Sequence, residues 1–132
     1  MQSEISASFT LTGLDFEPEE ITAKVGIIPS EIWRVGDLIS QRATIRHKHN
    51  GWSVNSKLEK SADLEDHVQS VLEQLQPGWL SLVELCKRYY AEIECVIYIV
   101  GDDRPAIHFD KHIMQQVAEL NAEIDVDLYV LE

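Results

Sequence analysis

The stretch Ile5-Ser6-Ala7-Ser8-Phe9-Thr10-Leu11-Thr12 alternates apolar residues and hydroxyl-bearing residues without a break. Successive side chains of a β-strand point to opposite faces of the sheet, so the alternation predicts a strand with one buried face and one polar face. Gly13 ends the pattern. The acidic run after it contains Pro18, which suits the first turn of a helix, and we expect that helix to close at Gly26.

A second local signal is Asn50-Gly51, which stands between two strand-like runs. This dipeptide is typical of a type I′ hairpin turn and predicts that residues 43–49 pair with residues 52–58. The hairpin would bury His47, His49 and Trp52 with the apolar residues on one face. The other face would form a contiguous, solvated positive patch carrying Arg42, Thr44, Arg46, Lys48, Ser53, Asn55 and Lys57.

The second half predicts two helices, two strands, a helix and a last strand. Ser61 is a plausible N-cap for a helix that ends at Pro77-Gly78, and a second helix should run from Trp79 to about Tyr89. Residues 92–99 predict a strand that is apolar on both faces toward its end, which places it centrally in the sheet. A short strand over 105–109, a helix capped by Asp110 and a strand over 124–131 complete the chain.

The resulting order is β-α-β-β-α-α-β-β-α-β in one domain that covers residues 1–132. Hairpins dominate this order, which favours an α+β two-layer sandwich with a mostly antiparallel sheet and helices on one face. The halves read β-α-β-β and β-β-α-β, both fragments of ferredoxin-like units. An internal duplication is therefore one interpretation of the order.

Composition excludes several classes of function. The chain has 132 residues with 11 Lys+Arg against 23 Asp+Glu, and its net charge is −12. Such a charge disfavours nucleic-acid binding, and no apolar run is long enough to span a membrane. The first residues lack the features of a signal peptide, so we expect a cytoplasmic location. Cys86 and Cys95 are expected to be buried thiols that pack as small hydrophobic side chains. We expect no cofactor.

Positive charge is concentrated in residues 34–60, while the rest of the chain is acidic. Trp33 and Arg34, in an irregular segment over 27–37, are residue types enriched at binding hot spots. We therefore expect a non-catalytic, charge-driven interaction module with a protein partner, for which an immunity-type inhibitor of a cationic toxin is one role. The candidate interaction residues are Trp33, Arg34, Arg42, Arg46, Lys48 and Lys57.

The alternative is a small enzyme or small-molecule binder. It would use a pocket between the 43–58 hairpin and the 27–37 loop, with His47, His49 and Trp52 as pocket residues beside Trp33 and Arg34. No phosphate-binding loop, nucleophile elbow or metalloprotease motif is present, so we assign no catalytic residue and lean against an enzyme. A homo-oligomer is a third reading, based on the apolar residues Val96, Tyr98 and Leu131.

Two further polar groupings carry weaker signals. His108 and His112 flank Asp110 and are ligand types for a transition metal, but Asp110 has a sufficient role as a helix cap, so we expect no metal site. Asp125 and Asp127 share one face of the last strand and could form an acidic patch with Glu92 and Glu94. Such carboxylates can bind cations, although a solvated sheet face is the simpler interpretation.

The sequence also resembles a known bacterial family along nearly its whole length. The resemblance rests on residues 14–22 with Pro29, on Ile32-Trp33-Arg34-Val35-Gly36-Asp37, and on residues 120–130. Together they are similar to the domain-of-unknown-function family 4279. The resemblance implies a compact, single-domain bacterial protein, and it carries no catalytic residues or substrate.

Overall fold

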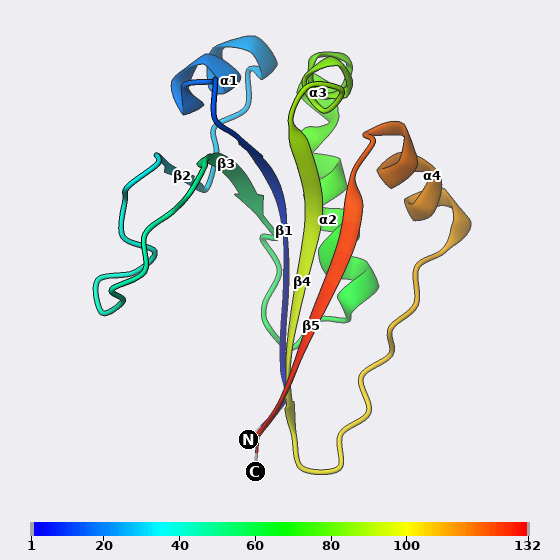
Figure 1. The fold of residues 1–132 in the computed structure, drawn as a ribbon. Helices are drawn as coiled ribbons and strands as arrows, with labels where there is room; N and C mark the ends of the chain where they lie inside the picture. Colours follow the sequence, from blue (N-terminus) through cyan, green and yellow to red (C-terminus); the bar gives the residue numbers. More distant parts are fainter. Residues whose placement is uncertain (1, 132) are drawn as a thin grey trace.

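A five-stranded open sheet with the order β2-β3-β1-β4-β5 is the frame of the protein (Figure 1). The computed structural model describes residues 2–131. The strands are β1 (Glu4–Gly13), β2 (Glu31–Trp33), β3 (Asn50–Asn55), β4 (Tyr90–Val100) and β5 (Glu123–Leu131). Neighbouring strands pair antiparallel except β4 and β5, which are parallel. The predicted α+β class with a mostly antiparallel sheet is confirmed. The strand predicted to be central, β4, is an interior strand next to β1, which takes the central position.

The helices cover one face of this sheet and leave the other face open (Figure 1). They are α1 (Pro18–Val25), α2 (Leu64–Leu75), α3 (Trp79–Leu85) and α4 (Lys111–Glu119), with a 3-10 turn η1 (Gln76–Gly78) between α2 and α3. None of the helices in residues 2–131 is long and apolar enough to cross a membrane.

The helix ends follow the local sequence. Pro18 occupies the first turn of α1, where its missing N–H costs no hydrogen bond, and Gly26 closes the helix with a φ of 70°. Asp110 caps α4 because its Oδ1 accepts a hydrogen bond of 2.8 Å from the Ile113 N–H. The N-cap of α2 is Asp63 and not the predicted Ser61.

The core lies between the sheet and the helices. Ile5, Ala7, Phe9 and Leu11 are all buried, so the alternation that opens the chain places one face of β1 in the core as predicted. These residues pack with the apolar side chains of β4 and of α2. Burial of each large apolar side chain stabilises the fold by about 1.5–3 kcal/mol.

The predicted hairpin at Asn50-Gly51 is wrong. These residues begin β3, whose partners are β1 and β2, and neither residue has the positive φ that a type I′ turn requires. The Asn50 side chain instead donates hydrogen bonds to the carbonyls of Leu14 and Phe16 and accepts one from the Val35 N–H. Contacts distant in the sequence therefore override the local turn preference.

Residues 36–47 form a small projecting arm in place of the predicted strand. Leu38 and Arg46 form an isolated antiparallel bridge, and the Ala43 N–H donates to the Ser40 carbonyl at the tip. The arm packs few side chains into the core, and Ile45, which the hairpin would bury, is 64% exposed. The cations of this segment remain in solvent on a loop and not on a strand.

The second half also differs from the predicted order. Residues 105–109 form no strand, and the chain runs β4-α4-β5 with β4 and β5 parallel. A parallel pair requires the chain to return along the full length of the sheet, and residues 101–110 make that return in an extended loop. The second half therefore lacks the β-β-α-β order on which the interpretation of duplicated ferredoxin-like halves rested.

A candidate binding face on the open side of the sheet

The open face of the sheet begins with the hydroxyl stripe of β1. Ser6, Ser8 and Thr10 alternate with the buried residues of the strand and so point away from the helices. Ser53 on β3 lies opposite Thr10, and their hydroxyl oxygens are 3.3 Å apart, a hydrogen-bond distance. The middle of this face is therefore lined by small polar side chains.

Carboxylates flank this stripe on the side of β4 and β5. Thr10 lies opposite Glu92, and Ser8 lies opposite Glu94. In the next pair of strands Glu92 is beside Glu123, and Glu94 is beside Asp125, with Asp127 two residues further along. The carboxylates that the sequence grouped as an acidic patch do share one sheet face. Like charges on adjacent strands destabilise a sheet, so this face carries an energetic cost.

The electrostatics of this acidic face reflect that crowding. Burial, followed by the neighbouring carboxylates Glu92, Asp127, Asp125 and Glu31, raises the pKa of Glu94. Burial and the adjacent Asp127 raise the pKa of Asp125. Within residues 2–131 no lysine or arginine pairs with the carboxylates of β4 and β5. The acidic face thus lacks an internal counterion.

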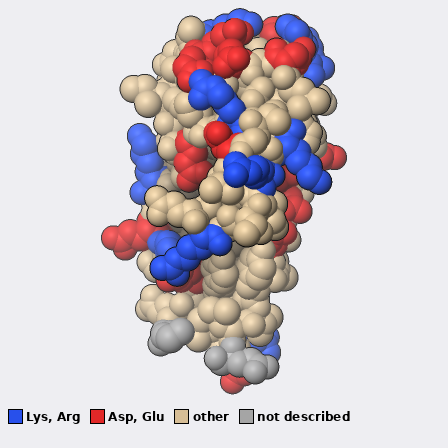
Figure 2. Space-filling model, turned by 60° about the vertical axis from the view of Figure 1, so that its left-hand side comes forward, with Lys and Arg blue, Asp and Glu red and all other residues tan. Residues whose placement is uncertain are grey.

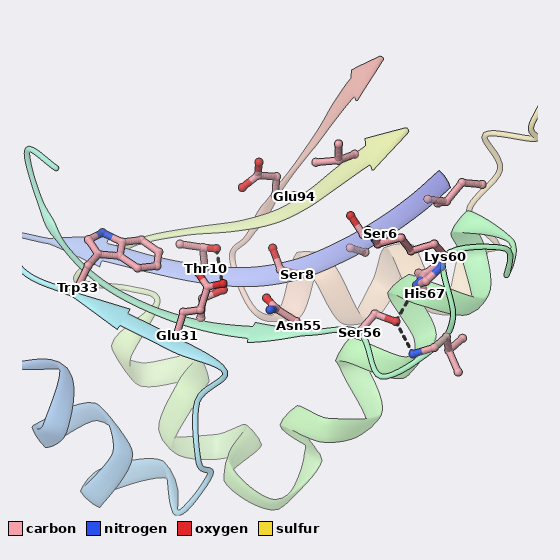
Figure 3. Close-up of a pocket in the computed structure, with 15 residues that line it drawn as sticks. Ser6, Ser8, Thr10, Glu31, Trp33, Asn55, Ser56, Lys60, His67 and Glu94 are labelled. Atoms are coloured by element: carbon pink, nitrogen blue, oxygen red, sulfur yellow. Dashed lines mark hydrogen bonds between the residues drawn. The ribbon is translucent and has the colours of Figure 1, made fainter. Parts of the chain in front are cut away.

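A cavity of about 370 Å³ lies on the open face between β2 and β4. Ser6, Ser8 and Thr10 line its floor, and Glu31 and Glu94 reach it from strands on either side of β1 (Figure 3). The indole of Trp33 closes one end. Lys60 and His67 lie at the opposite end.

Trp33 is held in place from two sides. A Cβ atom at Gly51 would come 1.9 Å from Cε2 of the indole, so the ring occupies the space that any larger residue at position 51 would fill. The His47 ring stacks on the indole with 4.8 Å between ring centroids and 19° between the planes. Glycine at position 51 therefore provides the seat of Trp33.

The predicted pocket residues separate into different environments. Trp33 and His47 come together, as described above. Trp52 is fully buried, and its Nε1–H donates a 3.0 Å hydrogen bond to the Thr22 hydroxyl. His49 is exposed beside Arg88 and Tyr89, away from the cavity on the open face. The predicted pocket between the 43–58 hairpin and the 27–37 loop does not form, because that hairpin is absent.

The predicted interaction cations also differ in their surroundings. Arg34 pairs with Glu17 and with Glu19, so its charge is already neutralised locally. Arg46 donates a 2.7 Å hydrogen bond to the Gly36 carbonyl. Arg42, Lys48 and Lys57 are exposed. Figure 2 shows lysine and arginine side chains interleaved with acidic ones on this side of the molecule, so the cations do not merge into the predicted contiguous patch.

A buried histidine that the sequence analysis missed lies at the far end of the cavity. His67 is 1% exposed, and its Nδ1 is 2.7 Å from the Ser56 hydroxyl. Its Nε2 has no hydrogen-bond partner of regular geometry within the described part of the chain. Burial lowers the pKa of the ring, and a backbone hydrogen bond at Glu59 opposes that shift. A signal was present in the sequence, since His67 lies three residues after Leu64 on the apolar face of α2.

The remaining candidates show no reactive arrangement. Cys86 and Cys95 are buried, and burial raises the pKa of each thiol to about 12, which keeps both protonated. His108 lies 3.7 Å from Glu65, and no group of three metal-ligating side chains is found in residues 2–131. Tyr98, one of the apolar positions of the oligomer reading, stacks on Tyr129 at 5.0 Å.

Comparison with known proteins identifies the family of the chain but gives no information about an activity. No curated protein and no solved structure matches the chain. One family model, described as a domain of unknown function, matches residues 3–131. The match covers nearly the whole chain and agrees with the resemblance in the sequence, and the protein belongs to the DUF4279 family.

Proposed function

We propose that this protein is a non-catalytic, charge-driven interaction module that binds a basic segment of a partner protein on the open face of its sheet. The observation that carries the proposal is the acidic face itself. Carboxylates of β4 and β5 stand side by side on a face that no helix covers. A bound basic segment would supply the positive charge that this face lacks.

The energetics support a binding role for this face. Adjacent like charges and a half-buried Glu94 with a raised pKa lower the stability of the free protein. A cationic partner removes that cost when it binds, and complementary charge also speeds association. An immunity-type inhibitor of a cationic toxin is one biological setting in which such a surface would act.

The alternative of a small enzyme has less support. The predicted pocket of His47, His49 and Trp52 is not formed, since Trp52 is in the core and His49 lies elsewhere. Both thiols are buried with a raised pKa, which makes them poor nucleophiles. The third reading, a homo-oligomer through Tyr98 and Leu131, requires like-charged acidic chains to associate, which disfavours it.

The test is the binding of a fluorescent hexa-arginine peptide to two matched double variants. Asp125→Asn with Asp127→Asn removes two charges from the acidic face. Glu20→Gln with Glu73→Gln removes the same charge from exposed positions of α1 and α2. We expect the first variant to bind about tenfold more weakly than the second. Equal affinities of the two variants would overturn the proposal, as would an absence of binding to the unaltered protein.

A further inference from the structure

We propose that the cavity bounded by Glu31, Glu94 and Trp33 receives one lysine or arginine side chain of the bound partner, with its cationic group between the two carboxylates. The inference rests on the proposed function and names the anchor of the binding face.

The two carboxylates approach the cavity from opposite sides. Glu31 is on the edge strand β2 and Glu94 is on β4, with β3 and β1 between them. A cation that lies over β1 would therefore have an acid on each side (Figure 3). A charge-assisted hydrogen bond from the cation would stabilise a partly desolvated carboxylate such as Glu94 more than one that is fully solvated.

The floor is deep because its side chains are small. Ser8 and Thr10 have short side chains and are half-buried, so an incoming side chain can lie directly on the strand. Their hydroxyl oxygens can accept hydrogen bonds from an ammonium or guanidinium group. The floor thus solvates a cation and would not favour a purely apolar side chain.

The Trp33 end explains why an organic cation is preferred to a metal ion. The indole is an apolar wall fixed between Gly51 and His47, and it matches the aliphatic stem of lysine or arginine. A metal ion would gain nothing from that wall. In residues 2–131 no three ligating side chains converge on one point.

The opposite end of the cavity is also polar. Ser56 accepts a hydrogen bond from the Leu58 N–H, so its own hydrogen is free to be donated to Nδ1 of His67. The Nε2 atom of that ring then carries a hydrogen, and this atom is buried from solvent. Lys60, also at this end, forms an ion pair with Glu4 at 3.5 Å, which reduces its repulsion of a cation that lies between Glu31 and Glu94.

The experiment blocks the cavity without changing its charge. Ser8→Leu fills the floor, and Thr12→Leu places the same side chain on the same face outside the cavity. The probes are Nα-acetyl-arginine methylamide and its neutral isostere, the citrulline derivative. Binding is followed through the NMR signal of the Trp33 indole N–H, and hexa-arginine affinity is measured in parallel.

We expect the arginine probe, and not the citrulline probe, to shift the Trp33 signal in the unaltered protein and in Thr12→Leu. In Ser8→Leu the shift should be lost, and hexa-arginine should bind about tenfold more weakly. Hexa-arginine binding that is unchanged in Ser8→Leu would overturn the cavity assignment and leave the acidic face as the binding surface. A lack of hexa-arginine binding to the unaltered protein would instead overturn the proposed function itself.

Discussion

Trp33 lies so close to Gly51 that a Cβ atom at position 51 would stand 1.9 Å from the indole Cε2. This contact joins β2 to β3 on the open face and closes one end of the cavity. It also explains why Asn50-Gly51 belongs to a strand: the glycine is needed for the space that it leaves and not for a turn conformation.

Gly51→Ala should destabilise the fold by about 1–3 kcal/mol, because the methyl group must displace the indole. Chemical denaturation measures the change. In a Trp33→Ala background the ring is gone, and the same substitution should be neutral or slightly stabilising, since alanine is less flexible than glycine in a strand. An equal loss of stability in both backgrounds would contradict the role of the contact.

Glu94→Gln should raise the melting temperature at pH 7. Burial and nearby carboxylates raise the pKa of Glu94 above its usual 4.5. The stability that the protonated Glu94 carboxyl contributes is therefore fully present below its pKa in the unfolded protein. It is lost as the pH rises through its higher pKa in the folded protein. Because solvent screens a half-exposed group, we expect a gain of about 2 °C at pH 7.

That gain should shrink as the pH falls below about 4, where the carboxyl becomes protonated in both the folded and the unfolded state. Glu73→Gln, at an exposed position of α2, serves as the control and should leave the melting temperature unchanged. A lower melting temperature of Glu94→Gln at pH 7 would show that the charge stabilises the free protein.

His67 should make the protein sensitive to mild acid. Burial lowers the pKa of this ring below 6.5, so the stability that it contributes is present above the unfolded pKa and is lost as the pH falls toward the folded pKa. We expect the melting temperature to fall by about 3 °C more between pH 7.5 and pH 5.5 in the unaltered protein than in His67→Gln. His112→Gln, at an exposed position, should keep the full pH dependence, and a curve of the same shape for all three proteins would refute the assignment.

The cysteines should be inert in the native state. Cys86 and Cys95 are buried with the pKa of each thiol raised to about 12, so very little thiolate forms at neutral pH. Ellman's reagent should label neither residue within minutes under native conditions and both at once in guanidinium chloride. Rapid labelling of the folded protein would contradict the burial of these thiols.

The sequence predicted those parts of the fold in which a hydrophobic pattern repeats over many residues. The alternation of β1 and β4, the helical spacing of α2 and the Pro18, Gly26 and Asp110 signals all appear in the structure. The acidic patch followed from the same alternation, because Asp125 and Asp127 necessarily share a face.

The parts that the sequence missed depend on contacts between distant residues. Strand β2 has only three residues, too few for a period to show. The Asn50 side chain bonds to Leu14, Phe16 and Val35, and these contacts outweigh the local preference for a turn. Glu31 joins the cavity only because β2 pairs with β3, so no pattern in the chain links it to Glu94.

If the acidic face attracts a basic partner, the rate at which the two associate must fall as salt screens their charges. Stopped-flow anisotropy with labelled hexa-arginine measures that rate at low and at high salt. We expect the rate to fall about tenfold between about 20 mM and about 500 mM salt. At low salt it should be slower for Asp125→Asn with Asp127→Asn than for Glu20→Gln with Glu73→Gln. A rate that is independent of salt, or equal in the two variants, would contradict this attraction.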